Sequence, residues 1–88
     1  MDIAQQQELQ KQWLEIQRGI TETVNSENEE VSITFNGFVE IISLKIKPDL
    51  ELDKIEELLT TTLNKGIKSV SQKAQNTFLL FQKQHGIH

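Results

Sequence analysis

Lysines are the side chains best suited to chemistry in this 88-residue chain, because the residue sets that covalent catalysis requires do not occur in it. There is no cysteine, and we find no Ser/His/Asp set, no phosphate-binding glycine loop and no cluster with metal-ligand spacing. His85 and His88 lie three residues apart, but no third ligand is near them in the sequence, and we interpret them as part of a frayed end. We therefore expect that the protein is not an enzyme and uses no metal or cofactor.

Charge is distributed unevenly along the chain, which has a formal net charge of −4. All 13 acidic residues lie in residues 1–57, which also carry five basic residues and have a net charge of −8. Residues 58–88 carry four lysines and no acidic residue. Such asymmetry can mark a segment that binds anions. Lysines in the C-terminal half of a helix also oppose the helix dipole, and they could pair with the acidic half, so charge alone leaves both explanations open.

Residues 54–83 are predicted to form a long helix with one apolar and one basic face. Asp53 is a good N-cap and Glu56 stands at N3, as in a capping box. Apolar residues hold one face for about seven turns. Gly66 falls on that face, where the missing side chain lets another backbone come close. At about 100° per residue, the opposite side carries four lysines, which we call the basic ridge: Lys54, Lys65, Lys68 and Lys83.

Another helix is predicted for residues 2–24, before an acidic linker at 25–30. Its apolar residues form a narrow seam with spacings of three and four, which favours contact between helices, often across a dimer. The helix that begins at 54, roughly 42 Å long at about 1.5 Å per residue, also outruns a small hairpin. We therefore predict a homodimer whose interface includes Leu9, Trp13, Ile16, Ile20, Phe78 and Phe81.

Residues 31–47 are the only stretch with β character, and Asn36-Gly37 within it is a strong hairpin signal. A three-residue loop that starts at Phe35 and has Gly37 left-handed places four apolar side chains on one face. The predicted pairs are Ile33 with Val39 and Val31 with Ile41. A two-residue loop would instead put the Glu40 carboxylate on the apolar face, so we predict the longer loop.

One extra residue is expected near Ile42, as a bulge or as a break between two strands, because the apolar residues change phase there. Beyond this point, Lys45 and Lys47 project together from the strand. They lie on the face opposite Leu44 and Ile46, since successive side chains of a strand alternate between its two faces. Two further cations are thereby brought close to each other in the sheet.

Together these elements predict a single α+β domain over residues 1–88, with the order α-β-β-(β)-α. Its parts are a helix at 2–24, an acidic linker at 25–30, a β-hairpin or three-stranded sheet at 31–47 and a helix at 54–83, in an intertwined homodimer. No apolar run approaches the roughly 20 residues that span a bilayer, and the N-terminus lacks the regions of a signal peptide. We expect a cytoplasmic location and no contact with a membrane.

This order of elements resembles that of the YbaB/EbfC family of bacterial nucleoid-associated proteins. The family pattern is an alternating strand, Asn-Gly, a few residues and a Val, then Ile-x-Ile-Asp-Pro and a long helix. The resemblance covers residues 30 to about 75, and the matching residues are Val31, Ile33, Asn36, Gly37, Ile41, Leu44, Ile46, Pro48, Ile55, Leu58, Leu59 and Asn64. It implies a small homodimer of helices and strands that binds DNA with little sequence preference.

The chain departs from the family pattern at three places. Lys47 stands where the family usually has Asp, and the acidic residues 27–30 replace a glycine-rich stretch. Residues 78–81, Phe-Leu-Leu-Phe, take the place of the usual tail rich in glycine and methionine. The matched positions are mainly structural, so the resemblance transfers no functional residue to this chain.

Two functions remain open. The first is dimeric binding of double-stranded DNA at the nucleoid, with little sequence preference, through the basic ridge and chiefly Lys65, Lys68 and Lys83. Other cations that we predict as DNA contacts are Lys54, Lys45, Lys47, Lys11 and Arg18. The second is a protein-interaction or assembly module that has lost DNA binding, in which the acidic half and the apolar seams contact a protein partner.

Overall fold

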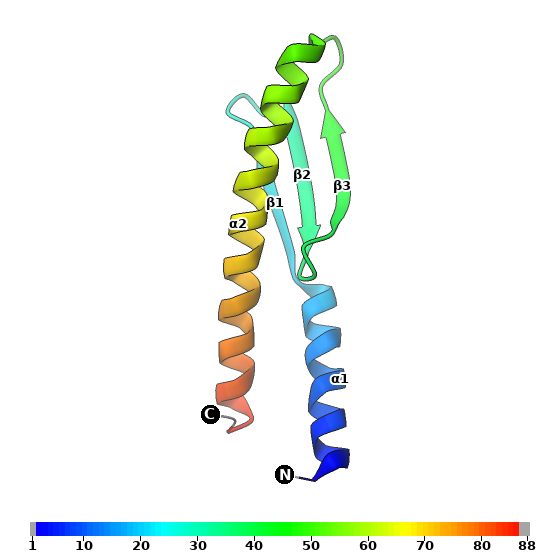
Figure 1. Cartoon of the computed structure of the whole chain (residues 1–88), viewed down its shortest axis with the longest axis vertical. Helices are drawn as coiled ribbons and strands as arrows, with labels where there is room; N and C mark the ends of the chain where they lie inside the picture. Colours follow the sequence, from blue (N-terminus) through cyan, green and yellow to red (C-terminus); the bar gives the residue numbers. More distant parts are fainter. Residues whose placement is uncertain (1, 87–88) are drawn as a thin grey trace.

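The computed structural model describes residues 2–86 and shows two helices and a three-stranded antiparallel sheet (Figure 1). In chain order the elements are α1 (Ile3–Gly19), β1 (Thr21–Asn25), β2 (Val31–Asn36), β3 (Ile41–Ile46) and α2 (Leu52–Gln84). The predicted α+β class is confirmed, and the molecule is a rod with extents of 57 × 18 × 14 Å. The sheet lies beside the first half of α2 and α1 lies beside its second half (Figure 1).

α1 begins with a capping box in the first residues of the chain. The Asp2 carboxylate accepts a hydrogen bond from the backbone N–H of Gln5 at 2.8 Å, and the Gln5 side chain accepts one from the backbone N–H of Asp2 at 3.3 Å. The helix ends at Gly19, so the predicted extent of 2–24 is wrong at its C-terminal end. No residue of α1 is fully buried, which makes this helix dependent on a few surface contacts.

Residues 21–25 form strand β1 instead of the last turn of α1. Four of the six residues from 20 to 25 are β-branched, and such side chains fit a strand better than a helix. The interval between Ile20 and Val24 explains the wrong prediction, because a spacing of four satisfies the helical period and the strand period of two alike. The predicted acidic linker is thus a turn that joins β1 to β2.

β2 lies in the middle of the sheet, and its pairing with β3 differs from the predicted register. The observed pairs are Ile33 with Leu44 and Val31 with Ile46, in place of the predicted pairs of Ile33 with Val39 and Val31 with Ile41. The prediction placed Phe35 in the loop, whereas the structure extends β2 to Asn36 and leaves Phe35 only 1% exposed. Burial of such a ring contributes about 1.5–3 kcal/mol, which the predicted register would lose.

The loop between β2 and β3 spans residues 37–40 and is organised by Asn36. The side-chain oxygen of Asn36 accepts two hydrogen bonds from backbone N–H groups that follow it, at 2.9 and 3.1 Å. The left-handed residue of this loop is Val39, with a φ of 62°, and not Gly37 as predicted. A glycine is needed at Gly37 for a different reason, because a Cβ there would overlap with the backbone carbonyl of Gln17 in α1.

A β-bulge interrupts the pairing of β2 with β3 at the place where one extra residue was predicted. Two successive residues of β2 pair with Ser43 and Ile41, so Ile42 is the extra residue, and the prediction is confirmed. The bulge brings Leu44 and Ile46 into phase with Ile41. Because paired residues of neighbouring strands share a face, these three side chains lie on the side of the sheet where α2 packs.

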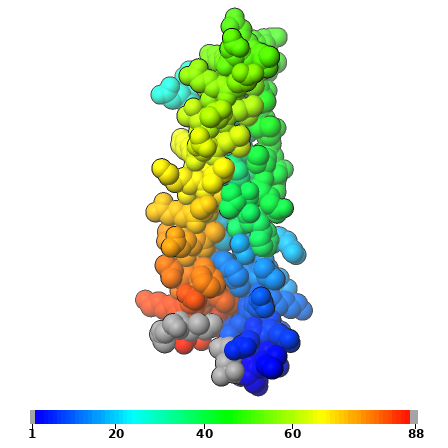
Figure 2. All heavy atoms as spheres, viewed as in Figure 1, coloured from blue at the N-terminus to red at the C-terminus, as the bar shows by residue number. Residues whose placement is uncertain are grey.

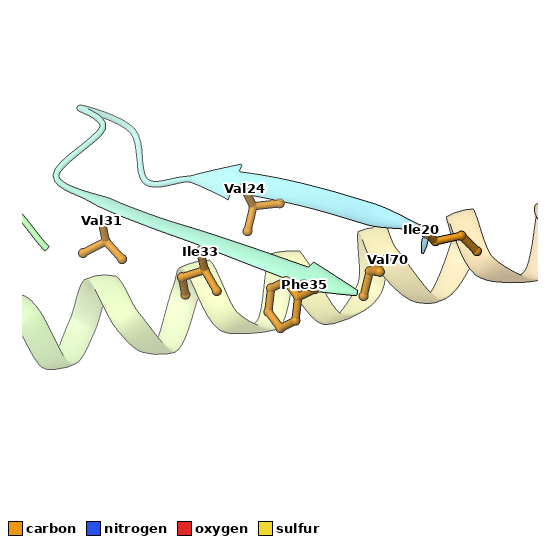
Figure 3. Packing of buried hydrophobic residues seen from close by; sticks show 6 residues of the cluster. All are labelled: Ile20, Val24, Val31, Ile33, Phe35 and Val70. Carbon is orange, nitrogen blue, oxygen red and sulfur yellow. The ribbon is translucent and has the colours of Figure 1, made fainter. Parts of the chain in front are cut away.

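The core lies between α2 and the sheet, where alternate residues of β2 face the helix (Figure 3). Val31, Ile33 and Phe35 are at most 1% exposed. α2 comes very close to the sheet at Gly66, where a Cβ would overlap with the Phe35 ring and lie 2.8 Å from Val24 Cγ2. A close neighbour was predicted at this glycine and is present, but it is an aromatic ring and not the predicted backbone.

α2 starts two residues before the predicted residue 54 and ends one residue after the predicted residue 83. Its N-cap is Glu51, which makes no side-chain capping hydrogen bond, so the predicted cap at Asp53 is wrong. Asp53 lies in the first turn, where its carboxylate still interacts favourably with the helix dipole. Neither helix within residues 2–86 has the length and apolar character needed to cross a membrane.

The contact between Gly66 and Phe35 predicts the effect of a single methyl group on stability. Gly66→Ala should lower the free energy of unfolding by roughly 1–3 kcal/mol, because the new methyl group must displace the Phe35 ring from a packed core. Urea denaturation followed by circular dichroism measures this change.

Gly19→Ala is the matched control for this experiment. A Cβ at Gly19 meets no atom within 4 Å, and alanine is favoured over glycine in a helix by about 0.5–1 kcal/mol. The control should therefore be at least as stable as the wild type. An unchanged stability of Gly66→Ala would mean that the Phe35 ring does not lie against α2.

Candidate nucleic-acid interface

The four lysines of the basic ridge are exposed on α2, outside the side of the helix that packs on the sheet. Figure 2 shows α2, coloured from green through yellow to orange-red, at the molecular surface. The structure brings Lys65 and Lys68 together, as the helical period indicated, and Lys83 is exposed further along the helix. The two lysines line an open depression whose residues are Asn64, Lys65, Lys68, Ser69 and Gln72.

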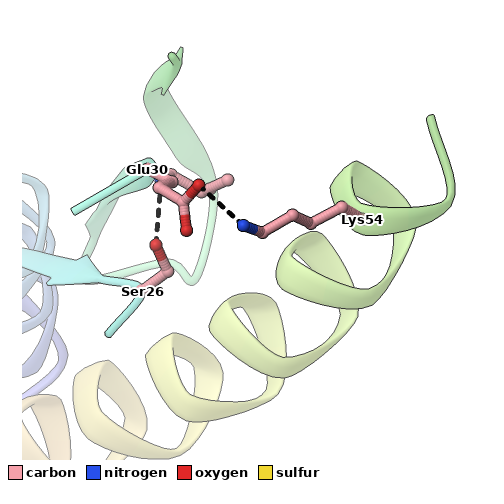
Figure 4. A network of polar contacts seen from close by, with 4 residues as sticks. Ser26, Glu30 and Lys54 are labelled. Carbon is pink, nitrogen blue, oxygen red and sulfur yellow. Dashed lines mark hydrogen bonds and ion pairs between the residues drawn. The ribbon is translucent and has the colours of Figure 1, made fainter. Parts of the chain in front are cut away.

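Lys54, the first lysine of the ridge, makes an ion pair with the turn between β1 and β2 (Figure 4). Its Nζ lies 3.1 Å from Glu30 Oε2, and the Glu30 side chain is only 10% exposed. Ser26 holds the same turn, because its Oγ accepts a hydrogen bond from the Val31 N–H at 2.9 Å. A carboxylate at this distance competes with phosphate for the ammonium group, so Lys54 is a weaker candidate for DNA contact than its position on the ridge indicated.

Lys73 also serves the fold, and the sequence analysis did not include it in the ridge. Its Nζ donates a hydrogen bond to the backbone carbonyl of Thr21 at 2.6 Å and so ties α2 to β1. Within residues 2–86 the structure shows one ion pair, that of Lys54. The ridge lysines that remain without an ion pair in the described part of the chain are Lys65, Lys68 and Lys83.

Lys45 and Lys47 belong to a different surface from the ridge. Lys45 pairs with Ser32, whose neighbours along β2 face α2, so both side chains point away from the helix. The two lysines line a depression that also contains Glu29 and Glu30. Two carboxylates in the same depression weaken its attraction for phosphate, so we rank these lysines below Lys65 and Lys68.

Lys11 and Arg18 are exposed on α1 and share one side of it, because seven residues make about two helical turns. Glu15 lies on the same side between them, at the spacings that favour pairing with either cation. The opposite side of α1 carries Trp13, which contacts α2. The structure therefore separates the α1 cations from the ridge and places a carboxylate among them.

The apolar seam of α1 packs against α2 of the same chain. The Trp13 ring centroid lies 4.8 Å from that of Phe78 and 5.7 Å from that of Phe81. Ile20 and Phe81 are 7% and 5% exposed, so contacts within one chain already bury them, and the structure does not support their predicted place at a dimer interface. The members of the predicted interface that stay partly exposed are Leu9, Trp13, Ile16 and Phe78.

β3 carries an apolar surface that the sequence analysis did not single out. Ile41, Leu44 and Ile46, which we call the β3 apolar strip, are 48%, 48% and 39% exposed, although they share the sheet face on which α2 packs. α2 packs on β1 and β2 and leaves most of β3 uncovered. The sequence shows that the residues of the β3 apolar strip are apolar. It does not show the position of α2, which decides whether these residues are covered.

The C-terminal end of α2 has a packing role. The His85 ring packs against the Phe81 ring at a tilt of 51°, with ring centroids 4.5 Å apart, while His88 lies outside the described residues. No group of three or more His, Cys, Asp or Glu side chains that could hold a metal is present within residues 2–86. What the described surface offers for recognition is therefore its distribution of cations, amides and apolar side chains.

Comparison with known proteins identifies a family for this chain. The model of the YbaB/EbfC DNA-binding family matches residues 2–83, which include α1, the whole sheet and all but the last residue of α2. The fold is similar to the crystal structure of the uncharacterized protein HP0035 from Helicobacter pylori, with a TM-score of 0.70 and 25% sequence identity over 88% of this chain and 94% of that chain. No curated protein matches the sequence. The chain belongs to the YbaB/EbfC DNA-binding family.

Proposed function

We propose that this protein is a homodimer that binds double-stranded DNA with little sequence preference, as a nucleoid-associated protein of the bacterial cytoplasm. Membership of a DNA-binding family supports DNA as the partner. The observation that carries the proposal is the exposure of Lys65 and Lys68, side by side, on a segment without acidic residues. Ammonium groups in this position can bind phosphates of the DNA backbone.

The contact is centred on Lys68 and the turns that follow it. Lys65 also lines a second depression that contains Glu27 and Glu57, so the beginning of the ridge attracts phosphate less strongly. No acidic residue follows Glu57, and Lys83 lies further along the same side of the helix. Because phosphate contacts position a protein on DNA without reading its bases, this arrangement supports a low sequence preference.

A second copy of the chain is the partner that we propose for the β3 apolar strip. β3 is the last strand in the sheet order β1-β2-β3, so its outer edge is unpaired within the described chain. An exposed apolar face beside an unpaired edge favours association with another chain. A dimer would present two ridges to one duplex, which doubles the number of phosphate contacts available to an acidic protein.

Replacement of both Lys65 and Lys68 by Gln should weaken binding about equally for all DNA sequences. It should also flatten the salt dependence, because each lost phosphate contact lowers the slope of log K against log salt by about 0.9. A dimer that loses four contacts would therefore lose at most about 3.6 from this slope. Fluorescence anisotropy titrations of a labelled duplex at several salt concentrations measure both effects.

Lys54→Gln is the matched control, since it removes the same charge from a lysine that is already paired with Glu30. This variant should change the slope of log K against log salt by less than about 0.9, the value for one phosphate contact. An unchanged slope for the double variant would move the DNA contact elsewhere, with Lys11 and Arg18 of α1 as the next candidates. A wild-type protein without DNA binding even at low salt would replace this proposal with that of a protein-interaction module.

Leu44→Asp should weaken the dimer by on the order of tenfold or more, because the β3 apolar strip would then bury an unpaired carboxylate. Sedimentation equilibrium distinguishes the 10.1 kDa monomer from a dimer of twice that mass. Leu80→Asp is the control, since Leu80 is 60% exposed on α2 and lies outside the strip. A wild-type monomer at micromolar concentration would contradict the homodimer, and a dimer insensitive to Leu44→Asp would move its interface to the α1 seam.

A further inference from the structure

We infer that the exposed side of α2 enters the major groove of DNA, where the amide side chains of Asn64 and Gln72 hydrogen-bond to adenine. This inference rests on the proposed function and adds base contacts to its phosphate contacts. It identifies the groove that the protein occupies and the base that it prefers at two positions.

The depression around Lys68 has the composition of a nucleic-acid contact rather than a protein contact. All five lining residues are polar, and four of them are exposed: Asn64, Lys65, Lys68 and Gln72. Interfaces between proteins have a core that is depleted in charge and enriched in aromatic side chains, which this depression lacks. Two cations between two amides match a surface that combines phosphate contacts with base contacts.

The dimensions of α2 select the major groove. An α-helix with its side chains is about 10–12 Å wide, which fits the major groove of about 12 Å but not the minor groove of about 6 Å. The sheet packs on one side of α2, and the yellow-green to yellow part of the helix lies at the molecular surface (Figures 1 and 2). The residues of the depression are polar and mostly exposed, so this part of the helix is accessible to a duplex. Lys65 and Lys68 then lie near the phosphates that border the groove.

Asn64 and Gln72 carry the functional group that recognises adenine. A side-chain amide can donate to N7 of adenine and accept from its N6 amino group, both of which are exposed in the major groove. The two residues are eight positions apart, or about 12 Å along the helix axis, which corresponds to three or four base-pair steps of about 3.4 Å. Two such contacts per chain leave most base pairs unread, which agrees with low overall sequence preference.

The glutamines of α1 are a less suitable alternative, because several of them already have partners in the fold. Gln5 completes the capping box, and Gln12 Nε2 lies 3.4 Å from Glu8 Oε1. Gln17 donates from Nε2 to the Gly37 carbonyl at 3.0 Å. The amides of α2 lie instead in a segment that has lysines and no carboxylate, where a duplex is attracted.

The test compares a duplex rich in adenine with the same duplex in which 7-deazaadenine replaces adenine. This change removes the N7 acceptor from the major groove and leaves the minor groove and the phosphates unchanged. The wild-type protein should bind the modified duplex about fivefold or more weakly, because each of the two amide contacts loses its hydrogen bond to N7. The double variant Asn64→Ala/Gln72→Ala should bind both duplexes with similar affinity and keep the salt dependence of the wild type.

Gln7→Ala is the control, because Gln7 is an exposed amide on α1, and it should discriminate between the duplexes as the wild type does. Circular dichroism verifies that each variant is folded. Equal binding of both duplexes by the wild type, or undiminished discrimination by the double variant, would overturn this inference and leave the proposed function intact. Failure of the wild type to bind either duplex at low salt would overturn both.

Discussion

The contact between the Phe35 ring and the bare backbone of Gly66 determines how α2 lies on the sheet. At this point α2 has no side chain between its backbone and the Phe35 ring, so the register of β2 and the rotation of α2 are coupled. The same helical turn carries Lys65 and Lys68, one residue before and two residues after Gly66. Rotation that directs Gly66 toward the sheet directs these lysines toward solvent, since each residue advances by about 100°. The core contact and the candidate DNA interface are thus two sides of one turn.

A single helix cannot cover this sheet. Strands lie about 4.8 Å apart, so three strands are wider than the contact surface of one helix of about 10–12 Å diameter. α2 packs on β1 and β2, where the residues that face it are buried, and leaves Leu44 and its neighbours on β3 exposed. The apolar surface offered to another chain therefore follows from the geometry of the fold.

The lysines of the long helix divide into those that hold the fold and those that stay available. Lys54 pairs with Glu30, and Lys73 donates to the carbonyl of Thr21, so each ties α2 to the edge or turn of β1. Lys65 and Lys68 lie between these two positions of the helix and make no ion pair within the described residues. This division gives an acidic protein a local surface that attracts phosphate, although its overall charge is −4.

Local patterns in the sequence were sufficient for the α+β class, the bulge at Ile42, the long helix and the side of that helix on which the lysines lie, because each depends on the period of one element. Only the tertiary structure decided the end of α1, since the interval from Ile20 to Val24 fits a helix and a strand equally. It also decided the register, because the burial of Phe35 depends on Gly66, a residue far away in the chain. The ion pair of Lys54 was also decided by the tertiary structure, because its partner Glu30 lies in the turn between β1 and β2. The sequence analysis predicted a linker for this turn.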